Sequence, residues 1–389
     1  MKSTRHALLF LAAFFILHSS FFISEATAAS PDAAVASRTW QGIPGLERTP
    51  NGRLFFTWFT GGDKEAKSKE DNTALLCHSD DGGKTHLPLQ VMAAPKDGSR
   101  CYDPVPWIDP KGRLWYIFNR GSKAGKHGVH ARVCENPDAP EPVFGPEFNI
   151  ELGVPYAYRV NKPTVLSTGE WLMPITFAKE PVDTWFVNAK SKQPALQGVA
   201  ISKDEGKTWK LRGEVVVPPW ALECMVIELK NSQIWMLVRT STGGFLYESH
   251  SGDKGETWSK GKPGKIATPG SRFFIRRLAS GNMLLVNHFN FIRDEKGKPK
   301  RSHLTAQIST DDGQTWGKGL LLDERVDVSY PDGVQDKDGL IWIIYDRDRK
   351  GDGDILMAKF REEDVIQGKN ATGAVVLRHL INNLNQPKK

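Results

Sequence analysis

The sequence is poor in cysteine and lacks the spacings that bind metal ions. Its 389 residues contain only four cysteines, Cys77, Cys101, Cys134 and Cys224. They lie far apart with no Cys-x-x-Cys pair, which excludes a zinc ribbon and a small disulfide-stapled scaffold. Apolar neighbours such as Leu76 and Val133 favour buried free thiols over a disulfide. No metal ion and no cofactor is expected.

Runs of lysine and arginine are also missing, and long apolar runs are confined to the N-terminus. The net charge is +7 without any basic cluster of the nucleic-acid-binding kind, so an acidic ligand is favoured over nucleic acid. Lys2 and Arg5 precede an apolar run over residues 7–17, and small residues follow at 26–28. This order predicts a secretory signal peptide over residues 1–29 and a secreted or periplasmic protein. No later run is long enough to span a membrane.

Helical patterns are scarce before the segment REEDVIQ at Arg361, and a repeated strand pattern takes their place. Six segments begin with a turn pair and continue as an aromatic, branched strand without strict alternation, which is typical of strands buried on both faces. They are NGRLFFTWF from Asn51, KGRLWYIFN from Lys111, TGEWLMPIT from Thr168, NSQIWMLVR from Asn231, SGNMLLVNH from Ser280 and DGLIWIIYD from Asp338. Their starts are 49 to 63 residues apart. The period predicts an all-β, six-bladed β-propeller as a single domain over residues 30–389.

A second repeat, Ser-x-Asp-x-Gly-x-Thr-Trp, occurs four times with one damaged copy. The copies are ISTDDGQTWG from Ile308, ISKDEGKTWK from Ile201, HSGDKGETWS from His250 and HSDDGGKTHL from His78. Aspartate can accept backbone N–H groups, glycine permits a positive φ, and tryptophan can pack between sheets. We therefore predict hairpin turns between the outer strands of a blade. A calcium loop is rejected, because one short acidic turn supplies too few oxygen ligands.

This combination resembles the sialidase-like propellers that carry Asp-box (BNR) repeats, and the resemblance covers the whole of residues 30–389. It implies an exo-glycosidase that hydrolyses a terminal acidic sugar with retention, using a tyrosine nucleophile, a glutamate relay, an aspartate acid/base and three arginines on the substrate carboxylate. A neutral phenol suits an anomeric carbon that bears a carboxylate, because an anionic nucleophile would be repelled. Arginine binds a carboxylate in a planar, bidentate way.

Four residues match the family's pattern in order. The segment LECMVIELKNSQIWMLVR resembles the fourth blade, which implies Glu223 as the relay and Arg239 as a carboxylate ligand. KRSHLTAQISTDDGQTW resembles the fifth blade and implies Arg301, and VSYPDGVQDKDGLIWIIYD resembles the sixth and implies Tyr330 as the nucleophile. Singly, each also fits an ordinary role at a strand end, a sheet edge, a basic loop or a strand interior. Their shared order favours a site.

The first blade departs from the family. In WQGIPGLERT, Gly42 stands where sialidases have an arginine before Ile-Pro. Arg48, six residues on, is one candidate replacement. Arg276 in SRFFIRRLASG and Arg347 in YDRDRKGDGD are two others. The departure leaves a uronic or another acidic sugar open beside sialic acid.

The acid/base and one pocket residue are assigned from neighbouring segments. GGDKEAKSKEDNTALLCHSDDG lies where the family has its catalytic aspartate. Asp71 is chosen because it is nearest the strand, with Asp63 and Glu70 as rivals, and a solvated charged loop fits equally well. Asp103 in CYDPVPWIDP resembles a second-blade aspartate that lines the substrate pocket.

Two other functions stay open at this point. A polysaccharide lyase acting on a uronate polymer needs a base, for which His130, His288 and His303 are candidates. A non-catalytic carbohydrate-binding propeller is the other. A monomer is expected in each case.

Overall fold

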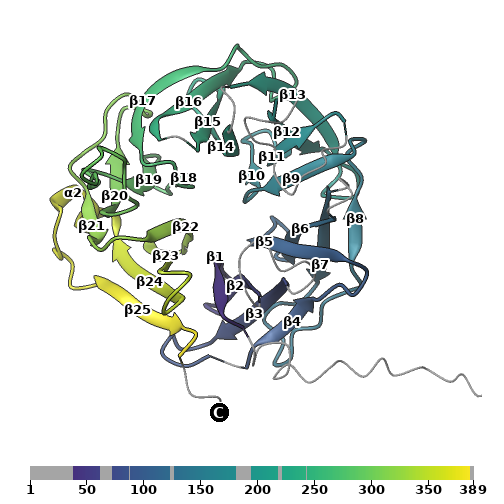
Figure 1. The fold of residues 1–389 in the computed structure, drawn as a ribbon, viewed down its shortest axis with the longest axis horizontal. Helices are drawn as coiled ribbons and strands as arrows, with labels where there is room; N and C mark the ends of the chain where they lie inside the picture. Colours follow the sequence, from purple (N-terminus) through teal and green to yellow (C-terminus); the bar gives the residue numbers. More distant parts are fainter. Residues whose placement is uncertain are drawn as a thin grey trace, which may run out of the picture.

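The computed structural model describes residues 38–61, 72–86, 88–122, 127–180, 194–217, 221–241 and 243–385. Over these residues the chain forms antiparallel sheets arranged as blades around one axis (Figure 1). The six-bladed propeller predicted from the repeats is confirmed. Residues 1–29, for which the signal peptide is predicted, lie outside the described part of the chain.

Each blade begins with a strand nearest the axis and proceeds outward. The inner strands are β1 (Trp40–Arg48), β5 (Ser99–Ile108), β9 (Tyr156–Val160), β14 (Ala221–Glu228), β18 (Phe274–Arg277) and β22 (Val328–Gln335). Their second strands are β2 (Leu54–Gly61), β6 (Leu114–Ser122), β11 (Trp171–Ala178), β15 (Ile234–Thr240), β19 (Met283–His288) and β23 (Leu340–Arg347). All six repeated segments of the sequence form these second strands, and these strands are largely buried on both faces, as predicted.

The third and fourth strands complete the blades. The third strands are β3 (Thr73–Ser79), β7 (His127–Cys134), β12 (Leu196–Ser202), β16 (Gly244–Ser251), β20 (Leu304–Ser309) and β24 (Asp354–Arg361). The fourth are β4 (Gln90–Ala93), β8 (Phe148–Ile150), β13 (Lys210–Val216), β17 (Lys262–Thr268), β21 (Leu320–Asp323) and β25 (Val376–Asn382). Blades 2 and 3 join into one sheet through a parallel pairing of His127 with Tyr156, and the two-residue β10 (Thr164–Val165) pairs with β11.

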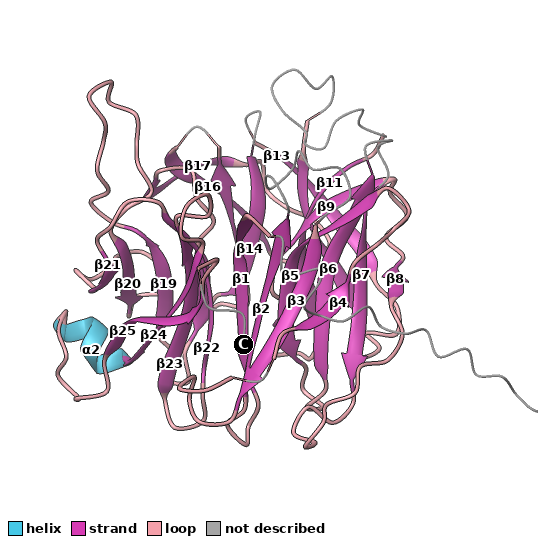
Figure 2. Ribbon diagram, turned by 60° about the horizontal axis from the view of Figure 1, so that its bottom comes forward, coloured by secondary structure: helices cyan, strands magenta, loops and turns pink. Residues whose placement is uncertain are grey.

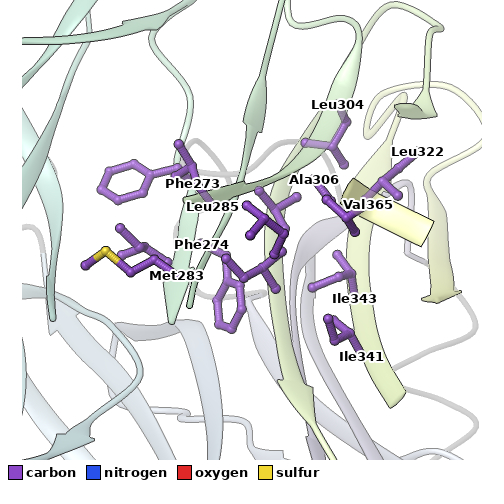
Figure 3. Close-up of a cluster of buried hydrophobic side chains, with 14 of the residues drawn as sticks. Phe273, Phe274, Met283, Leu285, Leu304, Ala306, Leu322, Ile341, Ile343 and Val365 are labelled. Carbon is purple, nitrogen blue, oxygen red and sulfur yellow. The ribbon is translucent and has the colours of Figure 1, made fainter. Parts of the chain in front are cut away.

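The core lies between the faces of neighbouring blades. Between blades 5 and 6, Phe274 and Leu285 of one sheet face Ile341 and Ile343 of the next (Figure 3). Removing such side chains from water makes the main favourable contribution to the free energy of folding, about 25 cal/mol per Å² of apolar surface buried. The short helix α2 (Glu362–Gln367), predicted from REEDVIQ, lies at the periphery of the ring against β24 of blade 6 and β20 and β21 of blade 5 (Figure 2).

Two sequence expectations concern cysteines and membrane spans. All four cysteines are buried and free, as predicted. Among the residues that the structure describes, no helix is both long and apolar enough to cross a bilayer.

The ring closes where β1 meets blade 6, through side chains and not through a shared strand. The backbone N–H of Ile43 donates to Asp346 Oδ2 at 2.7 Å. The N–H of Leu46 donates to Asp332 Oδ2 at 2.9 Å. The two bonds join residues 303 and 286 positions apart. Each gives a hydrogen-bond acceptor to a backbone N–H of the inner strand β1 at its bulge.

The Asp boxes are hairpin turns between third and fourth strands, as predicted. In the fifth blade, Ser309 Oγ donates to Asp311 Oδ1 at 2.7 Å, and the N–H of Gly313 donates to Ser309 Oγ at 2.8 Å. The N–H and hydroxyl of Thr315 both donate to the Asp311 carboxylate, at 2.9 and 2.5 Å. The other three copies repeat this network. The aspartate makes these bonds inside its own turn, so the box is structural.

This network predicts a pH-dependent stability difference for Asp311→Asn. The bonds from Thr315 lower the pKa of the Asp311 carboxyl to about 2, whereas an unfolded chain has about 4. A depressed folded-state pKa contributes stability above the unfolded pKa that is lost as pH falls through the folded one. We expect Asp311→Asn to lower Tm by about 2 °C at pH 7 and the difference to vanish near pH 2. Thermal unfolding followed by circular dichroism checks this, with the exposed Asp338→Asn as control; a constant difference across pH would contradict it.

Candidate active site

Four inner strands carry a β-bulge at the same level of the ring. The bulged residues are Ile43, Asp103, Glu223 and Tyr330, with φ between 51° and 60°. Positive φ is costly for such residues, on the order of 1–3 kcal/mol each, and persists where the surrounding structure imposes it. A bulge re-aims the side chain that it carries. Three of the predicted site residues thus owe their direction to the same local device.

A sequence signal for these bulges exists. Ile43, Asp103 and Tyr330 are each followed by proline, which has no N–H to give to the sheet ladder. The pairing between inner and second strands slips at each of these points. Repeated X-Pro pairs inside strands at the blade period therefore mark the level of the site.

Tyr330, Glu223 and Arg239 form a closed hydrogen-bonded group. The Tyr330 hydroxyl donates to Glu223 Oε1 at 2.8 Å. Arg239 Nη1 donates to the Tyr330 oxygen at 2.7 Å and also to Glu223 Oε2. All three side chains are at most 8% exposed. The phenol oxygen is thus held between an acceptor for its proton and a cation.

The charges around this group fix its protonation state. Burial alone would raise the pKa of Glu223, but the charges of Arg239 and Arg159 outweigh it and lower the pKa to about 2. Burial raises the pKa of Tyr330 above its ordinary value, against the opposing effect of Arg239. At neutral pH the pair is therefore a carboxylate next to a neutral phenol.

Four guanidinium groups surround the Tyr330 ring. Their Cζ atoms lie 4.1 Å (Arg349), 5.5 Å (Arg301), 5.7 Å (Arg239) and 6.0 Å (Arg272) from the ring centre. Arg239 Nε and Arg301 Nη2 both donate to the carbonyl of Gly270 at 3.0 Å, which holds these two side by side. So many cations around one neutral phenol create a strong positive potential that favours an anionic ligand.

Arg349 occupies the space next to Gly42. A Cβ atom at Gly42 would lie 2.8 Å from Arg349 Cδ and 2.9 Å from its Cγ and Nε. Asp346 Oδ2 accepts from Arg349 Nε at 2.8 Å, and Ser329 Oγ accepts from Nη2 at 3.0 Å. An arginine from blade 6 therefore fills the place that a side chain from blade 1 would take. The prediction that Arg347 fills it is wrong: Arg347 pairs with Asp354 at 3.2 Å.

Arg48 and Arg276, predicted to bind substrate, lie elsewhere. Arg48 is six residues along β1 from Gly42, about 20 Å at about 3.3 Å per residue, and pairs with Asp336 at 3.1 Å. Arg276 donates to the carbonyl of Pro163 at 2.5 Å and lies four residues beyond Arg272 along the chain. Both predictions are wrong, because four to six residues of extended chain carry these side chains away from the arginines around Tyr330.

Asp103 joins the cluster through an arginine that the sequence did not single out. Its carboxylate lies 3.2 Å from Arg159 Nε, and Arg159 Nε lies 3.7 Å from Glu223 Oε1. The Arg159 guanidinium is 5.0 Å from the ring centre of Tyr102 and 5.4 Å from that of Tyr158. Asp103 is only 1% exposed, so in this structure it is buried against Arg159 and supports the cluster from inside the protein. The segment YAYRV that contains Arg159 carries no motif that could have found it.

The predicted acid/base lies outside the described residues. Asp71 and its rivals Asp63 and Glu70 fall within 62–71, between β2 and β3. Gly61 pairs with Trp40 at the beginning of β1, which is the end of the inner strand where the bulge lies. The role of Asp71 stays a prediction.

The histidines considered for a lyase are held in other contacts. His288 Nδ1 lies 2.9 Å from the carbonyl oxygen of Ser302, and His303 Nδ1 lies 3.2 Å from Ser302 Oγ. His130 Nδ1 lies 2.9 Å from Glu147 Oε1. His288 is buried, which lowers its pKa to about 3. In the described part of the chain, no group of three or more histidine, cysteine or acidic side chains is placed to hold a metal ion.

Residues 52–343 match the family model of the BNR repeat-like domain. The chain belongs to this family. The BNR propeller is 25% identical over 320 residues to a sialidase of Bacteroides fragilis, a match that covers 72% of this chain and 55% of the relative. The chain thus spans about half the length of that relative.

Solved structures resemble this BNR propeller in fold. A Hadza microbial sialidase superposes with a TM-score of 0.67 at 18% identity, covering 85% of this chain and 67% of that one. Trypanosoma rangeli sialidase in complex with the inhibitor DANA gives 0.63 at 15%, covering 83% and 55%. A Dyadobacter fermentans protein of unknown function gives 0.58 at 17%, covering 83% and 94%. These likenesses show a sialidase propeller fold.

Proposed function

We propose that this BNR propeller is an exported exo-glycosidase that hydrolyses a terminal sialic acid with retention of configuration. The observation that carries the proposal is the Tyr330 hydroxyl, 2.8 Å from the ionised Glu223 and surrounded by arginines. The curated relative and several structural neighbours named as sialidases support the substrate class. Export is proposed on the N-terminal signal pattern alone.

In the proposed mechanism, Arg239, Arg301 and Arg349 bind the substrate carboxylate. Their guanidinium carbons lie 4.1 to 5.7 Å from the Tyr330 ring centre. A carboxylate bound by these arginines lies next to the Tyr330 nucleophile. In sialic acid the carboxylate is attached to the anomeric carbon itself, so the reacting carbon is then also next to Tyr330. A uronic acid bears its carboxylate across the ring oxygen, farther from the reacting carbon. This geometry favours sialic acid over a uronate.

The first half-reaction forms a bond between the Tyr330 oxygen and the anomeric carbon. The phenol proton passes to Glu223 as the glycosidic bond breaks, and Asp71 protonates the leaving oxygen. In the second half-reaction Asp71 takes a proton from water, whose oxygen attacks the anomeric carbon. Tyr330 departs and regains its proton from Glu223. Two inversions give net retention.

A mechanism-based label tests this proposal without relying on turnover. With 2,3-difluorosialic acid, fluoride leaves from C2, and the fluorine at C3 slows hydrolysis of the glycosyl-enzyme. Trypanosoma rangeli sialidase has been solved with this compound as a covalent intermediate. We expect intact-mass spectrometry to show one added fluorosialyl group, and peptide mapping to place it on Tyr330. The Tyr330→Phe variant is expected to remain unlabelled. If the protein hydrolyses sialosides but the label lies on another residue, the assignment of Tyr330 as the nucleophile is refuted.

A further inference from the structure

A groove between blades 4 and 5 is lined by none of the four arginines that surround the Tyr330 ring. Its volume is about 710 Å³, within the usual range of ligand sites. It is bordered by β15, β16 and β17 on one side and by β19 and β20 on the other. Its aromatic side chains are Trp235, His250, Phe289, Phe291 and Trp316. We call it the blade 4–5 groove.

Four polar atoms of side chains that line the groove have no hydrogen-bond partner among the described residues. They are Trp235 Nε1, Asn287 Oδ1, His288 Nε2 and Trp316 Nε1. Trp235, Asn287 and His288 are 6%, 2% and 1% exposed. A buried polar group without a partner is destabilising, so native structures rarely gather several in one place. Their concentration along one groove indicates a surface that a ligand completes.

The chemistry of these four atoms is mixed. The two indole N–H groups can only donate. Asn287 Nδ2 already donates to the carbonyl of Ala267 at 2.9 Å, which leaves Oδ1 as an acceptor. His288 Nδ1 faces the carbonyl of Ser302 at 2.9 Å and therefore carries the proton, so Nε2 is also an acceptor. Burial lowers the pKa of His288 to about 3, which keeps the ring neutral.

The acidic side chains at the groove are paired within the protein. Asp312 pairs with Arg277 at 2.6 Å, and Glu248 lies 3.5 Å from Lys262. Two cationic side chains, Lys265 and Arg293, also line the groove. The four atoms without partners are uncharged, however, and suit the hydroxyl groups of an uncharged ligand.

We propose that the blade 4–5 groove is a non-catalytic subsite for a neutral pyranose unit of a glycan. Sugar hydroxyls donate and accept at once, as two donors and two acceptors require, and the apolar faces of a pyranose pack on indole and phenyl rings. The four polar atoms are buried beneath the groove. A sugar reaches them after a small outward movement of the groove's edge, where Phe289 is 40% exposed. An apolar side chain in the groove would leave the four polar atoms without partners. The subsite does not depend on the activity proposed for Tyr330.

Saturation-transfer NMR on the full chain tests the subsite. The probes are the methyl glycosides of β-galactose, β-glucose, α-mannose and β-N-acetylglucosamine. We expect at least one to bind, and Trp316→Phe and Trp235→Phe each to weaken its binding about fivefold, because each removes the indole N–H together with the five-membered ring that carries it. Phe245→Ala, which removes a 51% exposed aromatic side chain of β16 outside the groove, serves as control and is expected to bind normally.

Two further measurements separate lost binding from lost folding and from effects at the Tyr330 site. Circular dichroism is expected to show that both tryptophan variants fold, and hydrolysis of a small fluorogenic sialoside is expected to be unchanged in Trp316→Phe. The absence of signal from all four glycosides would overturn the proposal. So would binding that survives both tryptophan variants or falls equally in Phe245→Ala.

Discussion

Removing one oxygen atom, in the Tyr330→Phe variant, is expected to lower kcat for a fluorogenic α-sialoside by about 10⁴-fold. The phenol oxygen is the atom of this side chain that Glu223 and Arg239 contact by hydrogen bonds, at 2.8 and 2.7 Å. Phenylalanine retains the ring that the arginines surround but cannot form the glycosyl-enzyme. Substrate binding should therefore change far less than turnover. Steady-state kinetics with purified protein measures both.

Tyr345→Phe provides a matched control for this experiment. Tyr345 is also a buried tyrosine of blade 6, and its hydroxyl donates to Asp323 at 3.2 Å, away from the cluster. It should keep full activity. Equal turnover of Tyr330→Phe and the unaltered protein would exclude the tyrosine mechanism. A rise in absorbance from an unsaturated product on a uronate polymer would point to the lyase instead.

Exchanging the arginine between blades is expected to give the second largest effect. Arg349→Gly should lower kcat/KM about 100-fold, since losing one charged contact to a buried carboxylate costs about 3 kcal/mol. Gly42→Arg in the same chain should restore at least about tenfold, because the new side chain enters the space that Arg349 leaves. Gly42 does not have the positive φ that would oppose a side chain. The measurement is kcat/KM for the single and double variants.

The control for the exchange comes from the same loop. Arg347→Gly removes an arginine that pairs with Asp354, and it should leave kcat/KM unchanged. Thermal unfolding of each variant separates lost binding from lost stability, because Arg349 also bonds Asp346. A double variant no more active than Arg349→Gly would show that the two positions are not equivalent.

The fold was largely predictable because its signals are local. Each second strand lies within ten residues of its turn pair, and each Asp box closes its own hydrogen bonds within seven residues. Tyr330, Glu223, Arg239 and Arg301 were predictable because segments of under 20 residues resemble the family's fourth, fifth and sixth blades. The structure brings these four together with Asp103.

The remainder of the site depends on contacts that no local pattern encodes. Arg349 fills the space at Gly42 because the last blade meets the first, a junction that the bond between Ile43 and Asp346 makes across 303 residues. Arg159 is fixed by tyrosines of two blades. Arg48 is near Gly42 in the sequence, but the length of a strand separates their side chains in space.

Asp346 has a place in both the architecture and the chemistry. The same carboxylate that accepts the amide of Ile43 also holds Ser329 and Arg349. The three arginines proposed to bind the carboxylate come from blades 4, 5 and 6, and the last of them is oriented by a carboxylate that also bonds blade 1. Blade 6 is the last of the six blades to be synthesised, so in the proposed enzyme the nucleophile and its third arginine join the site only when that blade folds against the others.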